Sequence, residues 1–250
     1  MVVNISMSDS SRLTQDYERD GVVLIRQFLS ADEVAEVRRE IDRYIREDLA
    51  AKTADARTME ADGRTVRNLW RLEQHDAKLR ALGERADICA FIAPLVRGEP
   101  LLMAVETFNK PARIGSGVPY HQDNAYFCQT PPDMLTVWIA IDAVTADNGP
   151  VFFVKGSHRL GVLPTRPSGV RGNSIGLAEV PDAPMSEQFC GLLAPGDATI
   201  HHCNTIHHSA PNRTDRSRLG LLVVFRGRHT QTDPKLKATY TEAATATPPA

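Results

Sequence analysis

The sequence predicts a mainly β protein with flanking helices, whose β part is a sandwich or jelly roll. Two observations favour this fold class. After residue 99, short apolar runs are separated by Gly, Pro and Asn residues, a pattern typical of many short strands joined by turns. Before residue 99, apolar residues recur mainly at helical spacing. We therefore predict a single domain over residues 1–237, with a helical N-terminal part over 12–98 and a β core over 99–228.

The N-terminal part is expected to open with a strand over 21–25 and to continue as a helix. Ser30 and Glu33 form the S-x-x-E pattern of a capping box, which predicts where that helix begins. Its predicted apolar face is Val34, Val37, Ile41 and Ile45, and its predicted solvated face is Arg38, Arg39, Glu40, Arg46 and Glu47. The stretch over 50–64 is expected to be a loop that could fold over a site as a lid, and residues 69–96 are expected to return to helix.

The β part follows from five apolar runs, at 101–108, 135–141, 151–154, 198–202 and 219–225. The segment over 160–188 is rich in Gly and Pro and is expected to be a loop, a kind of connection that often carries specificity. Arg166 and Arg171 in this loop could pair with an acidic group on a substrate, or they could remain solvated. The Thr- and Ala-rich end over 238–250 is expected to be a mobile tail.

Composition and charge predict an ordinary globular protein that acts on a small molecule. Hydrophobic residues make up 42% of the 250 residues, charged residues 24%, and the formal net charge is -2. This balance gives no reason to expect nucleic acid or an anionic membrane as a partner. The cysteines lack the spacing of a zinc module or a disulfide framework; they are Cys89, Cys128, Cys190 and Cys203. We expect a cytoplasmic protein with reduced thiols and no spanning helix, either a monomer or a homodimer.

The most informative motif is the triplet His121-Gln122-Asp123. Residues two apart in a strand point to the same side, so this triplet is expected to place an imidazole and a carboxylate on one face. A third ligand could come from the histidine-rich segment over 201–208. Two histidines and one carboxylate on one face of a metal leave the opposite positions open, as in non-haem iron(II) oxygenases. The triplet therefore predicts an iron oxygenase.

A second signal is the strand-like run that begins at Arg218. Period-two alternation places Arg218, Gly220, Leu222, Val224 and Arg226 on one side. Arg218 thus shares a face with Gly220, which has no side chain, and this leaves room for a small anion. The planar guanidinium suits a bidentate carboxylate. A dicarboxylic keto acid that chelates iron at one end and pairs with Arg218 at the other would account for both signals.

A longer set of segments occurs in order along the chain. It comprises Tyr120-His121-Gln122-Asp123, Asp147-Asn148-Gly149-Pro150, Lys155-Gly156-Ser157-His158, Pro195-Gly196-Asp197, Cys203-Asn204-Thr205-Ile206-His207, Pro211-Asn212 and Arg218. In this order and spacing, the chain resembles the phytanoyl-CoA dioxygenase family of iron(II)- and 2-oxoglutarate-dependent oxygenases from about Gly21 to Gly227. The resemblance implies a double-stranded β-helix, the cupin-like jelly roll, as the core. It also implies Fe(2+) as the metal, with 2-oxoglutarate and O2 as cosubstrates.

The resemblance further implies the roles of individual residues. His121, Asp123 and His207 match the metal ligands, and His207 alone among the clustered histidines has a serine two positions later and an arginine eleven positions later. Arg218 and Ser209 match the groups that bind the distal carboxylate of 2-oxoglutarate. The remaining histidines of the cluster, His201, His202 and His208, are then expected to support the site or to lie on a strand face.

Asn109, Tyr126 and Phe127 are less specific positions of the expected site. Asn109 matches a cosubstrate contact better than its neighbour Lys110 does. Tyr126 and Phe127 match a region that lines the substrate pocket, although aromatic residues could equally belong to the core. Trp138 lies in an apolar run and is expected to be packing.

The expected reaction is hydroxylation of a small molecule, with conversion of 2-oxoglutarate to succinate and CO2. Asp123 argues against halogenation, because related halogenases have a small residue at that position. The same iron core can also desaturate, epimerise or cyclise a substrate, and the sequence does not separate these outcomes. A zinc hydrolase would accept the same ligands but has no need of Arg218. A non-catalytic jelly-roll binding module would not need the complete set.

Overall fold

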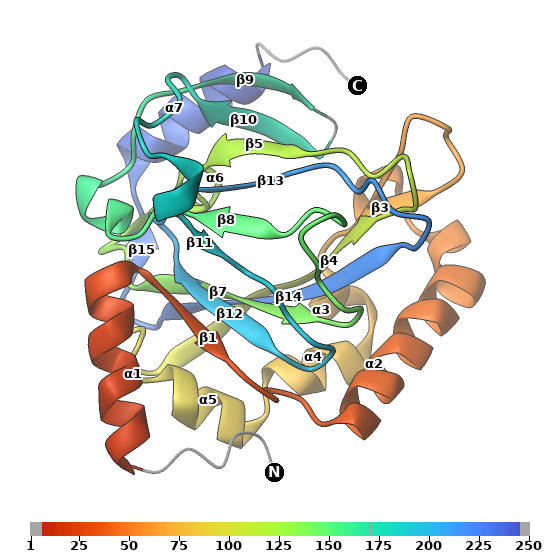
Figure 1. The fold of residues 1–250 in the computed structure, drawn as a ribbon, viewed down its shortest axis with the longest axis horizontal. Coiled ribbons are helices and arrows are strands. Elements are labelled where there is room, and N and C mark those ends of the chain that lie inside the picture. Colours follow the sequence, from red (N-terminus) through yellow and green to blue (C-terminus); the bar gives the residue numbers. More distant parts are fainter. Residues whose placement is uncertain (1–6, 171, 246–250) are drawn as a thin grey trace.

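The computed structural model describes residues 7–170 and 172–245, which form two antiparallel sheets, one above the other in Figure 1. The larger sheet consists, in spatial order, of β1 (Val22–Ile25), β12 (Ala198–His202), β7 (Met134–Ala140), β14 (Arg218–Gly227), β4 (Pro100–Lys110), β3 (Val66–Leu69) and β2 (Arg57–Met59). The smaller sheet consists of β11 (Phe189–Cys190), β8 (Val151–Phe153), β13 (His207–Ser209) and β5 (Val118–His121). This arrangement confirms the predicted mainly β fold.

Two short strand pairs and a set of helices surround the sheets. The pairs are β9 (Thr165–Val170) with β10 (Asn173–Leu177), and β6 (Gln129–Thr130) with β15 (Gln231–Thr232). The α-helices are α1 (Met7–Asp20), α2 (Ala31–Arg43), α3 (Leu72–His75), α4 (Ala77–Gly83), α5 (Ala86–Ile92), α6 (Asn124–Phe127) and α7 (Pro234–Thr245). A π-helical turn (Tyr44–Asp48) extends α2, and 3-10 turns lie at Leu49–Ala51, Ala54–Ala56, Ser157–Leu160 and Met185–Glu187. In Figure 1, α2, α4 and α5 lie on the side of the larger sheet that faces away from the smaller one.

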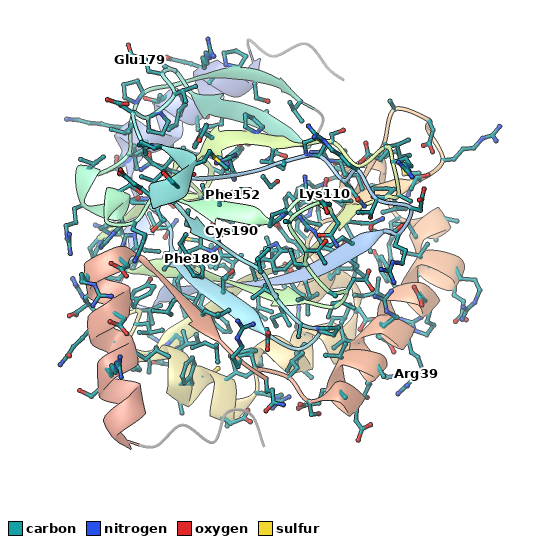
Figure 2. The ribbon with its side chains drawn as sticks, in the orientation of Figure 1. Arg39, Lys110, Phe152, Glu179, Phe189 and Cys190 are labelled. Carbon is teal, nitrogen blue, oxygen red and sulfur yellow. The ribbon has the colours of Figure 1, made fainter. Side chains whose placement is uncertain are left out.

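Helix α2 begins where the capping box predicts. Ser30 Oγ accepts a hydrogen bond from the Glu33 backbone N–H at 3.3 Å, and Glu33 Oε2 accepts one from the Ser30 N–H at 2.7 Å. The helix buries Val34, Val37 and Ile41 in the core. Its solvated face is smaller than predicted: Arg39 points to solvent (Figure 2), but Glu40 is buried and accepts hydrogen bonds from Arg43 and Lys78.

The two faces of β14 divide as the alternation predicts. Leu219, Leu221, Val223 and Phe225 belong to the core shared with the helices. Arg218, Leu222 and Val224 line a cavity on the other face. Gly220 also lies on the cavity face, but a Cβ at this position would overlap the indole of Trp138. Trp138 therefore fills the space above Gly220, whereas Arg218 lines the cavity.

We expect Gly220→Ala to destabilise the protein, because the added methyl group must displace a packed indole. Overpacking of this kind costs about 1–3 kcal/mol. Urea unfolding would measure the change in the free energy of unfolding. Gly98→Ala is the control, since its Cβ would meet only the His229 side chain, with Nδ1 at 3.2 Å. Equal stability of the Gly220→Ala protein and the parent would contradict the packing described for Trp138.

Three segments differ from the expectations for loops and helices. The expected loop over 50–64 contains β2, which extends the larger sheet by pairing with β3. The helix expected over 69–96 starts at residue 72 and is divided into α3, α4 and α5. The expected loop over 160–188 contains the hairpin of β9 and β10, whose turn uses the positive φ of Gly169 and Gly172. Contacts with other parts of the fold accompany these elements, since β3 packs against β4 and the β9–β10 hairpin packs against β5, and local composition does not report such contacts.

The expected tail is a helix as far as the structure describes it. Helix α7 packs against α6, β9 and β10, and the ring of Tyr240 lies 5.8 Å from that of Tyr126. Tertiary contact thus stabilises a segment whose composition predicts no structure. Residues 246–250 of the expected tail lie outside the described residues. Within the described ranges, no helix is long and apolar enough to cross a membrane. Cys89, Cys128, Cys190 and Cys203 are free cysteines.

Candidate active site

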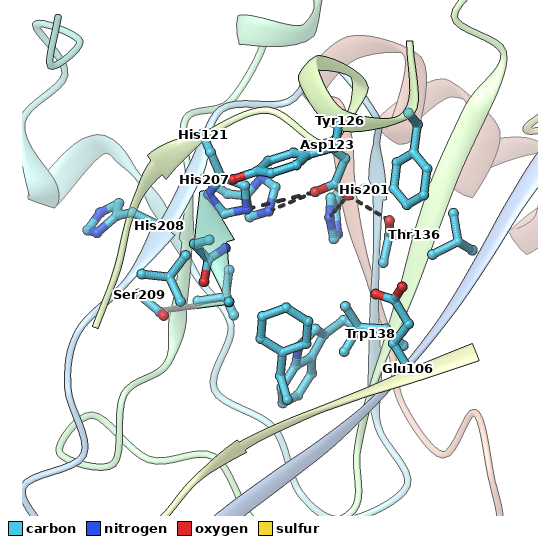
Figure 3. A pocket seen from close by; sticks show the side chains of 18 of the residues that line it. Glu106, His121, Asp123, Tyr126, Thr136, Trp138, His201, His207, His208 and Ser209 are labelled. Carbon is cyan, nitrogen blue, oxygen red and sulfur yellow. Dashed lines mark hydrogen bonds and ion pairs between the residues drawn. The ribbon is translucent and has the colours of Figure 1, made fainter. Parts of the chain in front are cut away.

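A cavity of about 410 Å³ lies between the two sheets and extends to α6 and α7 (Figure 3). Its floor is the inner face of the larger sheet, with Glu106, Lys110, Thr136, Trp138 and Arg218. His121 and His207 come from the smaller sheet on the opposite side. Pockets of this size hold small molecules.

Three residues at one end of the cavity could hold a metal ion: His121, Asp123 and His207. One candidate ligand atom from each lies within 4.8 Å of the other two. Strands β5 and β13 place His121 directly opposite His207 in an antiparallel pair. Asp123 Oδ1 lies 3.8 Å from His121 Nε2 and 3.5 Å from His207 Nε2. Of the four clustered histidines, His207 is thus the one in this group.

Asp123 reaches the group by a different route from the one predicted. Strand β5 ends at His121, and Asp123 has helical backbone angles (φ −60°, ψ −36°) at the start of α6. The residue between them, Gln122, is fully buried, and its amide donates hydrogen bonds to the carbonyls of Gly161 (2.8 Å) and Asn204 (2.7 Å). Gln122 therefore anchors the turn that follows β5. This turn, and not strand alternation, brings Asp123 beside His121.

Hydrogen bonds orient each of the three groups toward a common point. His121 Nδ1 lies 2.9 Å from the Pro119 carbonyl oxygen, and His207 Nδ1 lies 2.9 Å from the Thr205 carbonyl oxygen. Both rings therefore carry their proton on Nδ1 and direct the Nε2 lone pair toward Asp123. Metal-binding histidines are commonly held in this way.

Two contacts to the second carboxylate oxygen of Asp123, Oδ2, orient this side chain. Oδ2 accepts a hydrogen bond from Thr136 Oγ1 at 2.7 Å and lies 3.1 Å from His201 Nε2. This arrangement leaves Oδ1 facing the two imidazoles. His201 thus supports the site, in the role expected for it, whereas Thr136 lies in a strand with no motif and was not predicted.

The protonation states suit a metal. Burial lowers the pKa of both His121 and His207, so both imidazoles are neutral at neutral pH. Burial opposes ionisation of Asp123, but the neighbouring imidazoles outweigh it and hold the pKa of Asp123 below its ordinary value. Two neutral imidazoles and one carboxylate can bind a divalent cation without first losing protons.

We expect Thr136→Val to weaken metal binding without unfolding the protein. Valine keeps the shape of threonine but removes the hydroxyl that holds Asp123 Oδ2, so the carboxylate loses one of its two orienting contacts. Changes to such supporting groups cost about 10- to 100-fold in metal affinity or activity. Anaerobic titration with Fe(II) would measure the loss, and an unchanged affinity would show that Thr136 does not orient Asp123.

Arg218 lies on the same cavity face of the larger sheet and is only 1% exposed. Its guanidinium carbon lies 4.9 Å from the centre of the Trp138 ring, and Nη2 donates to the Gly149 carbonyl. Nε has no partner within the described part of the chain. Asp142, whose charge acts on Arg218, is paired with Arg38. Burial lowers the pKa of Arg218 to about 9, so the guanidinium remains a cation at neutral pH.

The structure places Lys110, and not Asn109, beside Arg218. Lys110, labelled in Figure 2, is the partner of Arg218 in the pairing of β4 with β14, and it lines the cavity. Burial and the neighbouring Arg218 lower the pKa of Lys110 to about 6. Asn109 lies on the opposite face of β4, where its amide donates to the Val66 carbonyl at 3.0 Å. The preference for Asn109 over Lys110 was therefore wrong. Successive residues of a strand point to opposite faces, so a motif match that is one position off selects the wrong face.

The other expected residues divide into two groups. Ser209, Tyr126 and Phe127 line the cavity. Trp138 does so as well, although it was expected only to pack. Arg166 is exposed on β9 and does not line this cavity, because the hairpin turns its side chain outward. Arg171 lies outside the described residues.

Two further histidines of the cluster have other contacts. His208 lies apart from the three candidate ligands in Figure 3. Its Nε2 is 3.1 Å from Gln188 Oε1. The His202 ring contacts those of Tyr17 and His158 instead. Neither belongs to the candidate metal group.

The chemistry of these groups defines a class of protein. Two imidazoles and a carboxylate leave half of a metal's positions open, as in non-haem iron(II) oxygenases. Arg218, on the same cavity face and without a carboxylate partner among the described residues, suits the far carboxylate of a dicarboxylic keto acid. Both are carried by two facing antiparallel sheets. The fold and the site together are those of an iron(II) oxygenase that uses a keto acid as cosubstrate.

Comparison with known proteins agrees with this class of protein. A model of the phytanoyl-CoA dioxygenase (PhyH) family matches residues 17–220. The chain is 27% identical over 232 residues to the ectoine dioxygenase of Stutzerimonas stutzeri (strain A1501). This match covers 86% of this chain and 76% of that relative. The solved structure of EctD from S. alaskensis superposes with a TM-score of 0.73 at 21% identity, over 87% of this chain and 76% of that one. The epimerase SnoN from nogalamycin biosynthesis gives 0.72 at 24% identity, over 92% and 85%.

The chain belongs to the phytanoyl-CoA dioxygenase family. It is therefore an iron(II)- and 2-oxoglutarate-dependent dioxygenase, and the structural likenesses confirm the predicted jelly-roll core.

Proposed function

We propose that this dioxygenase hydroxylates a small molecule in the cavity between the two sheets. His121, Asp123 and His207 bind Fe(II), and Arg218 and Ser209 hold the distal carboxylate of 2-oxoglutarate. One observation carries the cosubstrate assignment: Arg218 is a fully buried cation that faces the cavity and has no carboxylate partner among the described residues. A buried guanidinium is costly to leave unpaired, so a bound dicarboxylate stabilises it.

Each residue has a defined task in this proposal. When bound, iron with 2-oxoglutarate and O2 supplies the oxidation of a substrate carbon and releases succinate and CO2. The two imidazoles and Asp123 fix one face of the metal, because their orienting hydrogen bonds hold Nε2 and Oδ1 in place. Arg218 fixes the register of 2-oxoglutarate. Lys110 adds a second donor beside Arg218 and gains charge when the dicarboxylate enters, since the anion raises its lowered pKa.

The test is succinate formation that depends on an added small molecule. We expect the purified protein with Fe(II), 2-oxoglutarate and O2 to release succinate in stoichiometric proportion to a product that has gained one oxygen atom. Mass spectrometry separates this result from the other reactions of the iron core: epimerisation leaves the mass unchanged, whereas desaturation and cyclisation remove two hydrogen atoms. Product with either of those masses would contradict hydroxylation while preserving the oxygenase assignment.

A cytoplasmic location and a monomeric or homodimeric state complete the proposal. The four free cysteines support a reducing compartment. Light scattering of the purified protein would give the oligomeric state directly.

A further inference from the structure

Glu106 is an acidic side chain on the floor of the cavity. In the larger sheet it lies opposite Leu222 of β14, which in turn lies opposite Trp138 of β7. All three line the cavity. Figure 3 shows the Glu106 carboxyl group pointing from β4 into the cavity, on the side of Thr136 and across from Ser209.

No described residue neutralises Glu106. Its carboxyl group takes part in no hydrogen bond or ion pair within residues 7–170 and 172–245, whereas nearby Glu73 accepts a hydrogen bond from the Val105 N–H at 2.8 Å. Burial, together with the charges of Asp123 and Glu73 and against the opposing charge of Arg71, raises the pKa of Glu106 to about 8. Among the described residues, only the charge of Arg71 favours the ionised form of Glu106, and it is outweighed, whereas a cation in the cavity would stabilise that form.

The basic side chains of the cavity floor, Lys110 and Arg218, lie in a different region. Lys110 and Glu106 are on the same strand face, four residues apart, which corresponds to roughly 13 Å along the strand. Phe108 lies between them and packs edge-on against Trp70, with ring centres 5.5 Å apart. A dicarboxylate held at Arg218 and Lys110 thus leaves Glu106 free for a second molecule.

The cavity that Glu106 lines suits an organic cation more than an inorganic one. Trp70, Phe108, Tyr126, Phe127, Trp138 and Tyr240 give the cavity an aromatic lining. Aromatic faces attract ammonium and guanidinium groups and pack against hydrocarbon. A metal ion would require several oxygen ligands, whereas Glu106 offers it a single carboxyl group.

We propose that Glu106 is a specificity-determining residue that pairs with a positively charged group of the substrate, so that the enzyme acts on amines or related organic cations. The inference rests on the proposed function, since it places the substrate between Glu106 and the iron. It assigns Glu106 no part in the oxidation itself.

The experiment compares two probes of nearly equal shape, benzylamine and benzyl alcohol. Each is titrated calorimetrically, without oxygen, into protein that carries Fe(II) and 2-oxoglutarate. Four proteins are used: the parent, Glu106→Gln, Glu106→Asp and the control Glu179→Gln. Glu179 is an exposed carboxylate beyond β10, at the surface of the molecule in Figure 2.

We expect the parent and Glu179→Gln to bind benzylamine about 10- to 100-fold more tightly than benzyl alcohol, as a charge-assisted pair in a partly desolvated site allows. Glu106→Gln is expected to lose this preference while binding the alcohol unchanged. Glu106→Asp, which keeps the charge, is expected to retain part of it. Equal binding of the two probes by the parent, binding of neither at millimolar concentration, or a preference that survives Glu106→Gln would overturn the proposal.

A separate reading distinguishes this inference from the proposed function. The visible absorption of Fe(II) chelated by 2-oxoglutarate is recorded for each protein before titration. Its absence in the parent would contradict the proposed function, whereas its presence with no amine preference would contradict only the role of Glu106.

Discussion

His207→Ala is expected to abolish iron binding and turnover. Removal of this imidazole leaves His121 and Asp123 as the remaining candidate ligands, and two protein ligands hold Fe(II) far more weakly than three. The effect is expected to be local, because His207 lies on a strand whose backbone pairing with β5 and β8 does not involve the side chain. Anaerobic titration with Fe(II) and succinate release would both register the loss.

His208→Ala is the matched control for this result. His208 is the next residue on β13, but its ring stacks on Phe152 and contacts Gln188, away from the candidate ligands. We expect His208→Ala to keep most of the iron affinity, with at most an altered preference among substrates. Retained activity in His207→Ala together with loss in His208→Ala would show that the wrong histidine has been assigned.

The second large effect is expected for Arg218→Ala. Loss of a charge-assisted bidentate pair costs about 2–5 kcal/mol when the partner charge stays buried, which corresponds to roughly 30- to 4,000-fold in 2-oxoglutarate affinity. Arg218→Lys keeps the charge but loses the fork, so its loss is expected to be smaller. Iron affinity is expected to change little in both variants. Calorimetric titration of the iron-loaded proteins with 2-oxoglutarate would give the three affinities.

Arg226→Ala serves as the control for Arg218. Arg226 is on the same strand, but a bulge between Val224 and Phe225 precedes it, and its Nη1 donates to the Thr230 carbonyl at 2.8 Å. We expect this substitution to leave 2-oxoglutarate affinity nearly unchanged. A loss as large as that of Arg218→Ala would mean that general destabilisation of β14, and not an anion contact, causes both effects.

The sequence predicts those parts of the molecule that depend on local pattern. The alternation of β14 and the capping box of α2 need only residues close in the chain, and both are present in the structure. His121, Asp123 and His207 could be grouped because their order and spacing match a family motif. Helix α7 and the hairpin of β9 and β10 could not be predicted, because contacts with distant segments stabilise them.

Within the site, the positions that were missed share one cause. Thr136, Trp138 and Glu106 face the cavity only because β4, β14 and β7 pair in a particular register. Strand β7 is buried on both faces, so its sequence carries no alternation that would separate cavity residues from core residues. Alternation along β4 could have separated Lys110 from Asn109 once the cavity face of that strand was known.

The most direct test of the account is an anaerobic titration of the iron-loaded parent protein with 2-oxoglutarate. The titration is monitored through the visible absorption that this keto acid gives when it chelates Fe(II). We predict that the absorption grows to saturation at one 2-oxoglutarate per chain. Iron binding without any such absorption would contradict the central claim that His121, Asp123, His207 and Arg218 form one site for Fe(II) and 2-oxoglutarate.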